Sequence, residues 1–125
     1  MSVSFNIKPI DTDEFKIQLA IPPENPTMRG FVTVGAKVRS KNELKEFGEK
    51  IQANEFEDDI AILQAMYPGG VKGLGSDAGP VEGDKVWEFL QTSPVGGFIV
   101  PALIEAYFDQ YQGARQKNSA RLRSR

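Results

Sequence analysis

The sequence predicts an α+β fold in which an N-terminal antiparallel sheet of two or three strands packs on three or four C-terminal helices. Three observations predict it: apolar and polar residues alternate over residues 3–39, a helix-capping motif begins at residue 40, and apolar residues recur beyond it at helical spacing. The length of 125 residues fits one domain. We expect this domain to span residues 1–118, with a flexible basic tail over residues 119–125.

The predicted sheet begins with a hairpin. Apolar side chains take every second position of residues 15–21, and a second set, Val32, Val34, Ala36 and Val38, shares one face. The three prolines within residues 22–26 cannot continue a strand ladder, so they form the turn between the two strands. Residues 2–7 alternate in the same way and predict an additional edge strand. An isolated hairpin is marginally stable, so the helices must cover this sheet.

Residues 40–68 predict two helices. Ser40 and Glu43 form a capping box, and Leu44, Phe47 and Ile51 follow on one helical stripe that ends near residues 53–54. Acidic residues 57–59 suit the N-terminus of a second helix, which ends before the Pro-Gly-Gly at residues 68–70.

Two further helices are predicted over residues 84–91 and 95–117. Pro101 lies inside the second of them and predicts either a kink near Phe98 or a new helix start at Pro101. Residues 68–83 between the helices contain six of the 12 glycines, which predicts a mobile loop. These glycines lack the Lys-Ser/Thr of a phosphate-binding loop, and no apolar strand precedes them.

The composition argues against an enzyme. The chain has no Cys and no His, which excludes disulfides, zinc sites built on these residues, and nucleophile–histidine pairs. The dense carboxylate run at residues 55–59 lacks the spacing of a calcium loop and is interpreted as a solvated helix N-terminus. We therefore expect no catalytic residues, no metal and no cofactor.

The net charge of −2 conceals two unlike parts. Residues 1–110 carry ten basic and 17 acidic side chains, whereas residues 111–125 carry five basic side chains and no acid. The basic end is either a frayed, solvated terminus or a contact for an acidic partner, and the acidic body disfavours nucleic acid. The chain contains no apolar run of 18 residues and begins without a signal-peptide pattern, so we expect no membrane span and a cytosolic protein.

Aromatic residues gather in the C-terminal third of the chain. The last predicted helix has an apolar stripe too broad for one contact face, which predicts either a central core helix or a helix that also meets a partner. The candidate partner-binding residues are Trp87, Phe98, Tyr107, Phe108 and Tyr111, with Arg115 and Lys117 beside them.

Three segments resemble the tail assembly chaperones of long-tailed phages. The opening Ser-Phe-Asn-Ile-Lys-Pro of residues 4–9 leads to a strand ending in Ile-Pro at 21–22, and residues 38–44 resemble the strand-to-helix junction of that family. Residues 104–108, Ile-Glu-Ala-Tyr-Phe, lead into Gly-Ala-Arg-Gln-Lys-Asn at 113–118, which is similar to the family's C-terminal helix. The glycine-rich segment and Pro101 depart from the family pattern.

The resemblance implies a binding role without chemistry. Members of this family bind the tape measure protein in the host cytoplasm, keep it soluble, recruit tail tube subunits, and are absent from the finished virion. Many are also made in a longer, frameshifted form. A groove lined by the aromatic candidates would then receive a tape measure helix, with Arg115 and Lys117 pairing with acids at its rim. The alternative is a structural tail or head-tail completion protein; self-association is left open.

Overall fold

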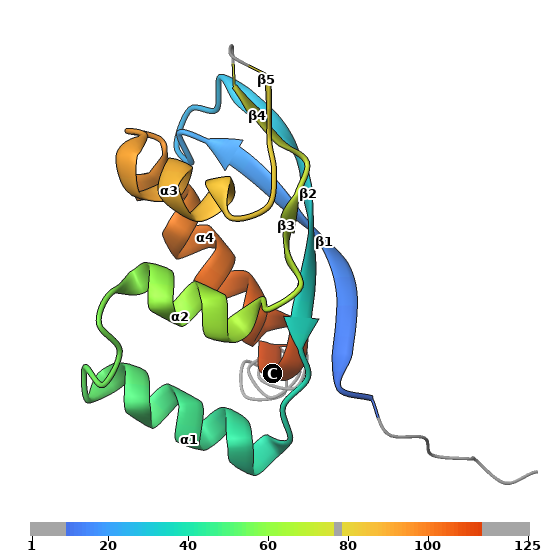
Figure 1. Ribbon diagram of the computed structural model, residues 1–125, viewed down its shortest axis with the longest axis vertical. Helices are drawn as coiled ribbons and strands as arrows, with labels where there is room; N and C mark the ends of the chain where they lie inside the picture. Colours follow the sequence, from blue (N-terminus) through green and yellow to red (C-terminus); the bar gives the residue numbers. More distant parts are fainter. Residues whose placement is uncertain (1–9, 77–78, 114–125) are drawn as a thin grey trace, which may run out of the picture.

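The protein forms two layers, a sheet and a set of helices on one of its faces (Figure 1). The computed structural model describes residues 10–76 and 79–113. In these ranges the elements, in chain order, are β1 (Thr12–Ile21), β2 (Met28–Lys37), α1 (Lys41–Gln52), α2 (Asp59–Met66), β3 (Gly70–Lys72), β4 (Leu74–Ser76), β5 (Gly79–Val81), α3 (Lys85–Thr92), α4 (Gly96–Phe108) and a π-helical turn, η1 (Asp109–Gly113). The predicted α+β class, with an N-terminal antiparallel sheet followed by helices, is confirmed.

Strands β1 and β2 form the predicted hairpin. They pair antiparallel over their full length, from Thr12 opposite Lys37 to Ile21 opposite Met28. The alternation predicted from the sequence is present, because Ile17, Leu19, Ile21, Val32, Val34 and Ala36 are all buried on one face. The edge strand predicted for residues 2–7 lies outside the described residues.

The glycine-rich segment differs from the prediction. Most of it is extended: β3 joins the sheet beside β2, with Val71 opposite Val34, while β4 and β5 form a small separate hairpin. The physical reason lies in a close backbone approach between two glycines. A Cβ atom on Gly35 would come within 2.8 Å of the Cα of Gly69, and the amide of Gly69 donates to the Gly35 carbonyl at 2.9 Å. Glycine therefore allows β3 to reach β2.

Helices α1 and α2 begin where the sequence predicts. The Ser40 hydroxyl accepts a hydrogen bond from the Glu43 amide at 3.2 Å, and the Glu43 carboxylate accepts from the Ser40 amide at 2.9 Å, which completes the capping box. The hydrogen bond from Ser40 lowers the pKa of Glu43. Asp58 caps α2 by accepting from the Ala61 amide at 2.8 Å. The two helices bury Leu44, Phe47, Ile60, Ile62, Leu63 and Met66.

A tight turn joins α3 to α4. The Gly96 amide donates to the Ser93 carbonyl at 2.9 Å, which brings the last turn of α3 against the first turn of α4. A Cβ on Gly96 would overlap the carbonyl oxygen of Leu90, so this contact requires glycine. The expected helix restart at Pro101 is wrong, because Gly96–Phe108 forms one helix that contains Pro101. The helical pattern changes later, at Asp109, where the π-helical turn begins.

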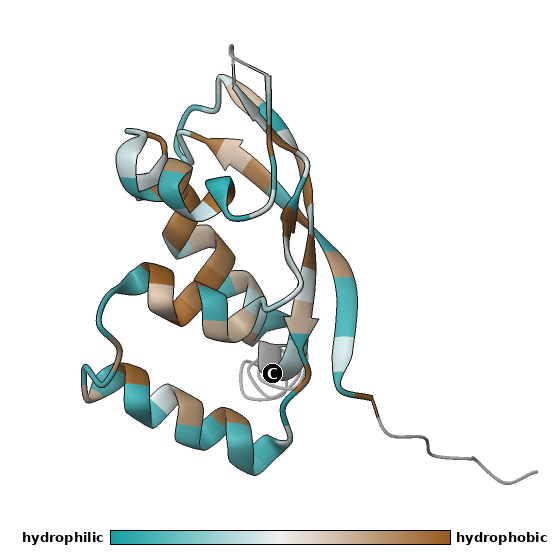
Figure 2. Cartoon of the chain, viewed as in Figure 1, coloured by the Kyte–Doolittle hydropathy of each residue, from teal (hydrophilic) through white to brown (hydrophobic). Residues whose placement is uncertain are grey.

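Helix α4 is the centre of the core. It contacts β1, α2 and α3, and it buries Ile99, Val100, Leu103 and Tyr107. Its residues are mainly apolar (Figure 2). Of the two interpretations of the broad apolar stripe, the central core helix fits this packing. None of the helices in the described ranges is long and apolar enough to cross a membrane.

Candidate partner-binding site

Three of the predicted site residues, Tyr107, Phe108 and Tyr111, belong to an aromatic cluster inside the protein. Tyr107 is fully buried. Its ring centroid lies 5.0 Å from that of Tyr111, 5.7 Å from those of Tyr67 and Phe108, and 6.1 Å from that of Phe47. Such tilted and edge-on contacts stabilise a core beyond the area they bury. Tyr107 has no exposed surface, so in the described structure it is a core residue and does not line a groove.

The hydroxyl of Tyr107 ties α4 to the junction of β2 and α1. It donates to the Lys37 carbonyl at 2.6 Å and accepts from Nη1 of Arg39 at 2.9 Å. The Arg39 guanidinium also lies 4.0 Å from the centre of the Phe47 ring. Burial raises the pKa of Tyr107 despite the opposing effect of Arg39. These contacts hold α4 against the segment between β2 and α1 and keep the Tyr107 hydroxyl neutral.

The two neighbouring tyrosines act in the same way. The buried Tyr67 hydroxyl donates to the Leu103 carbonyl at 2.6 Å, and burial raises the pKa of Tyr67 strongly. Tyr111 donates to Oδ2 of Asp13 at 3.3 Å, and burial followed by the charge of Asp13 raises the pKa of Tyr111 to about 12. All three tyrosines are therefore neutral hydrogen-bond donors at physiological pH.

The other predicted site residues do not assemble with this cluster. Trp87 is half-buried on α3, and Phe98 is exposed in the first turn of α4. Arg115 and Lys117 lie outside the described residues. In the described structure the five aromatic candidates therefore do not line one common hollow, and their role in partner binding stays a prediction.

A different surface combines exposure with apolar character. Two of its large side chains, Met28 and Phe31, are 51% and 62% exposed. They border a hollow of about 210 Å³ between the turn end of the β1–β2 hairpin, β4, and the junction of α3 and α4. We call this hollow the apolar groove; it is lined by Leu19, Ile21, Met28, Arg29, Gly30, Phe31, Val32, Gly73, Leu74, Gly75, Phe89, Val95 and Ile99.

Gly30 keeps the apolar groove open. It occupies a core-facing position of β2, opposite Leu19 and between Met28 and Val32. No described atom lies within 4 Å of where its Cβ would be. A glycine at an inward position of an otherwise apolar strand leaves a space the size of the missing side chain. This glycine is visible in the sequence two positions before Val32, but the apolar set predicted for the second strand began at Val32 and did not include it.

The size and charge of the apolar groove define what it can hold. A cavity of about 150 Å³ accommodates a benzene ring, so this hollow receives one large aliphatic or aromatic side chain. Among its described lining residues, Arg29 alone is charged. The arrangement therefore suits an apolar anchor side chain on an amphipathic helix, with an acidic residue near it.

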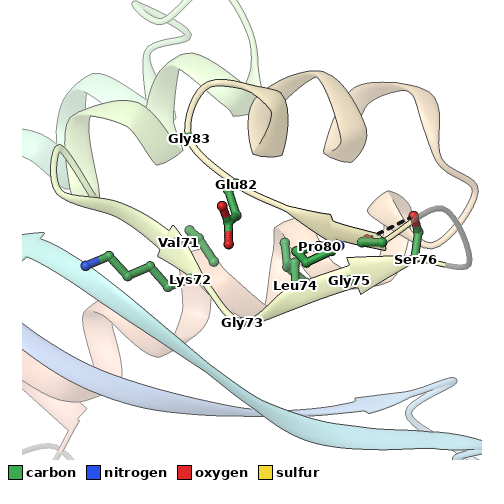
Figure 3. A pocket seen from close by; sticks show the side chains of 10 residues that line it. Val71, Lys72, Gly73, Leu74, Gly75, Ser76, Pro80, Glu82 and Gly83 are labelled. Carbon is green, nitrogen blue, oxygen red and sulfur yellow. Dashed lines mark hydrogen bonds between the residues drawn. The ribbon is translucent and has the colours of Figure 1, made fainter.

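A larger hollow lies between β3, β4 and β5 (Figure 3). It measures about 750 Å³, and four of its ten described lining residues are glycines, with Lys72 and Glu82 as the charged side chains. Lys72 and Glu82 carry opposite charges, and no Lys-Ser/Thr pair follows the glycines. The hollow therefore has no feature that favours phosphate binding. Within residues 10–76 and 79–113 no group of three Asp or Glu side chains is placed to hold a metal ion.

Comparisons with known proteins add no constraint on this site. The sheet, the tyrosine cluster and the apolar groove are therefore interpreted from the residues alone. The chain matches no protein-family model, no curated protein and no solved structure.

Proposed function

We propose that this protein is a tail assembly chaperone of a long-tailed phage. It binds helical segments of the tape measure protein in the host cytoplasm, keeps them soluble, and is released when tail tube subunits polymerise around the tape measure. The three segments of sequence resemblance support this role. The observation that carries it is the apolar groove, an exposed apolar site bordered by Met28 and Phe31 that can receive a helix anchor.

The energetics of the apolar groove suit reversible binding. Complete burial of a Met or Phe side chain stabilises by about 1.5–3 kcal/mol, and Met28 and Phe31 are only about half exposed. Together with one anchor side chain from the partner, the gross gain is a few kcal/mol, before the entropy lost on association. After that cost, binding at this single site is expected to be weak, with a dissociation constant of about 1 mM or above, which corresponds to about 4 kcal/mol or less. A chaperone that must leave during assembly requires binding of this strength.

Graded filling of the apolar groove tests the proposal. The variants Gly30→Ala, Gly30→Val and Gly30→Ile add side chains of increasing size to the open position on β2. Labelled tape measure peptides carrying single apolar anchors should bind progressively more weakly, with at least a tenfold loss for Gly30→Ile, as measured by fluorescence anisotropy. Gly48→Ala on α1, which also meets no described atom, is the control and should bind as the parent protein does.

Two results would contradict this assignment. Full binding by folded Gly30→Ile would exclude the apolar groove. Loss of binding in folded Phe108→Ala or Tyr111→Ala, with the Gly30 series unaffected, would return the site to the aromatic face of the C-terminal helices. Mass spectrometry of purified particles separates the chaperone from a structural tail or head-tail completion protein, because only a structural component remains in the virion.

A further inference from the structure

One face of the three-stranded sheet has no described element packed on it (Figure 1). The helices cover the face that carries Ile17, Leu19 and Val34, so the alternate residues of β1, β2 and β3 point to the other side. We call this second side the open sheet face. Its side chains on β1 and β2 are exposed or half-buried.

The open sheet face reverses the charge of the rest of the protein. It carries Lys16, Arg29, Lys37 and Lys72, all exposed, and among its described residues Glu14 is the single acid. The face therefore has a net charge of +3. The rest of the chain carries 11 basic and 16 acidic side chains, a net charge of −5. Basic side chains therefore outnumber acidic ones on this face, whereas the reverse holds for the rest of the chain.

The strand register places these cations around one exposed aromatic ring. Lys16, Thr33 and Lys72 lie opposite one another and form one row across the three strands. Phe31, 62% exposed, is two residues from Thr33 along β2, and Arg29 is two residues further. Residues two apart on a strand are separated by about 7 Å, and directly opposed Cβ atoms by about 5 Å. Phe31 therefore has cations on both sides along the strand.

We infer that the open sheet face binds an acidic segment of a partner protein. An apolar side chain of that segment covers Phe31, and its carboxylates pair with Arg29 on one side and with Lys16 and Lys72 on the other. Charge complementarity favours this occupant. A nucleic acid is a poorer fit, because the rest of the chain carries a net charge of −5, and a single ring offers one stacking position.

The open sheet face shares Arg29 and Phe31 with the border of the apolar groove, but its three lysines belong to this face alone. Lys16, Lys37 and Lys72 do not line the groove, so their substitution separates the two surfaces. The probe is a fluorescein-labelled peptide of about ten residues, the length of β2, that alternates glutamate with leucine. The full chain should bind it with an affinity that falls as salt rises, because the contacts are charge pairs on the surface.

Two triple variants of equal charge change give the decisive comparison. Lys16→Gln/Lys37→Gln/Lys72→Gln should weaken peptide binding about tenfold, through loss of the Lys16 and Lys72 charge pairs and of the third positive charge that Lys37 adds to the face. Lys41→Gln/Lys45→Gln/Lys85→Gln, on the exposed sides of α1 and α3, should leave binding unchanged. Phe31→Ala should weaken binding severalfold and leave its salt dependence intact. Circular dichroism checks that each variant is folded.

Equal losses of peptide affinity in the two triple variants would overturn the inference. Binding would then depend on the net charge of the protein and not on the lysines of the open sheet face. Stronger binding of an oligothymidine of similar length, sensitive to the same lysines, would also overturn it and assign the face to single-stranded nucleic acid. No measurable binding of the peptide by the parent protein at low salt would overturn it as well.

Discussion

Addition of one methyl group at Gly96 should destabilise the protein strongly. The α3–α4 turn brings the Gly96 backbone against Leu90, and a Cβ there would overlap the Leu90 carbonyl oxygen and lie 2.9 Å from its carbonyl carbon. These are backbone atoms of a helix, so no flexible side chain can move aside. Overpacking of a core costs about 1–3 kcal/mol, and a clash with fixed backbone belongs at or above the upper end. We expect Gly96→Ala to lower the free energy of unfolding by about 3 kcal/mol or more.

The adjacent residue provides the matched control. Gly97 lies in the same turn of α4, and no described atom comes within 4 Å of where its Cβ would be. Gly97→Ala should therefore stabilise the protein, by up to about 1 kcal/mol, through helix propensity. Urea unfolding of both variants, monitored by circular dichroism, measures their free energies of unfolding. Equal stabilities of Gly96→Ala and the parent protein would refute the close α3–α4 contact.

Three further predictions concern the caps and the tyrosines. Ser40→Ala should lower the free energy of unfolding by about 1 kcal/mol through loss of the capping box, measured by urea unfolding with an unchanged m value. Tyr107→Phe should cost about 1–3 kcal/mol, because it leaves the Lys37 carbonyl without its 2.6 Å donor; a change below the error of the measurement would contradict this role. The pKa of Tyr111, raised to about 12, lies above the value of about 10 in an unfolded chain. The unfolded state therefore loses this proton first, so the contribution of Tyr111 to stability is complete below about pH 10 and is lost between about pH 10 and 12. Tyr111→Phe should show a shallower loss of stability over that interval, and identical pH profiles would exclude the coupling.

The sequence predicted the elements that local rules determine. The β1–β2 hairpin follows from strict alternation, and the start of α1 follows from Ser40 and Glu43, whose capping interactions lie within three residues of each other. Strand β3 could not be predicted in this way. Its place in the sheet depends on the contact between Gly35 and Gly69, which are distant in sequence, and a glycine-rich segment has no β propensity of its own.

The candidate site was harder to predict, for a related reason. Helical spacing identified Tyr107 as part of an apolar stripe, but spacing does not reveal whether another element covers that stripe. In the folded chain Phe47, Tyr67 and Tyr111 surround it. The apolar groove, in contrast, exists because Gly30 has no side chain, and a pattern search for apolar residues passes over such a position.

The hydrogen bonds of the tyrosine cluster have a consequence for synthesis on the ribosome. Tyr107 is bonded to Lys37 and Tyr111 to Asp13, partners 70 and 98 positions earlier in the chain. The β1–β2 hairpin leaves the ribosome before the helices, and the apolar face of β1 stays uncovered until α4 has been made. A hairpin alone is marginally stable and prone to association. Folding of this domain is therefore completed late in translation, and chains that end before Tyr107 are expected to aggregate.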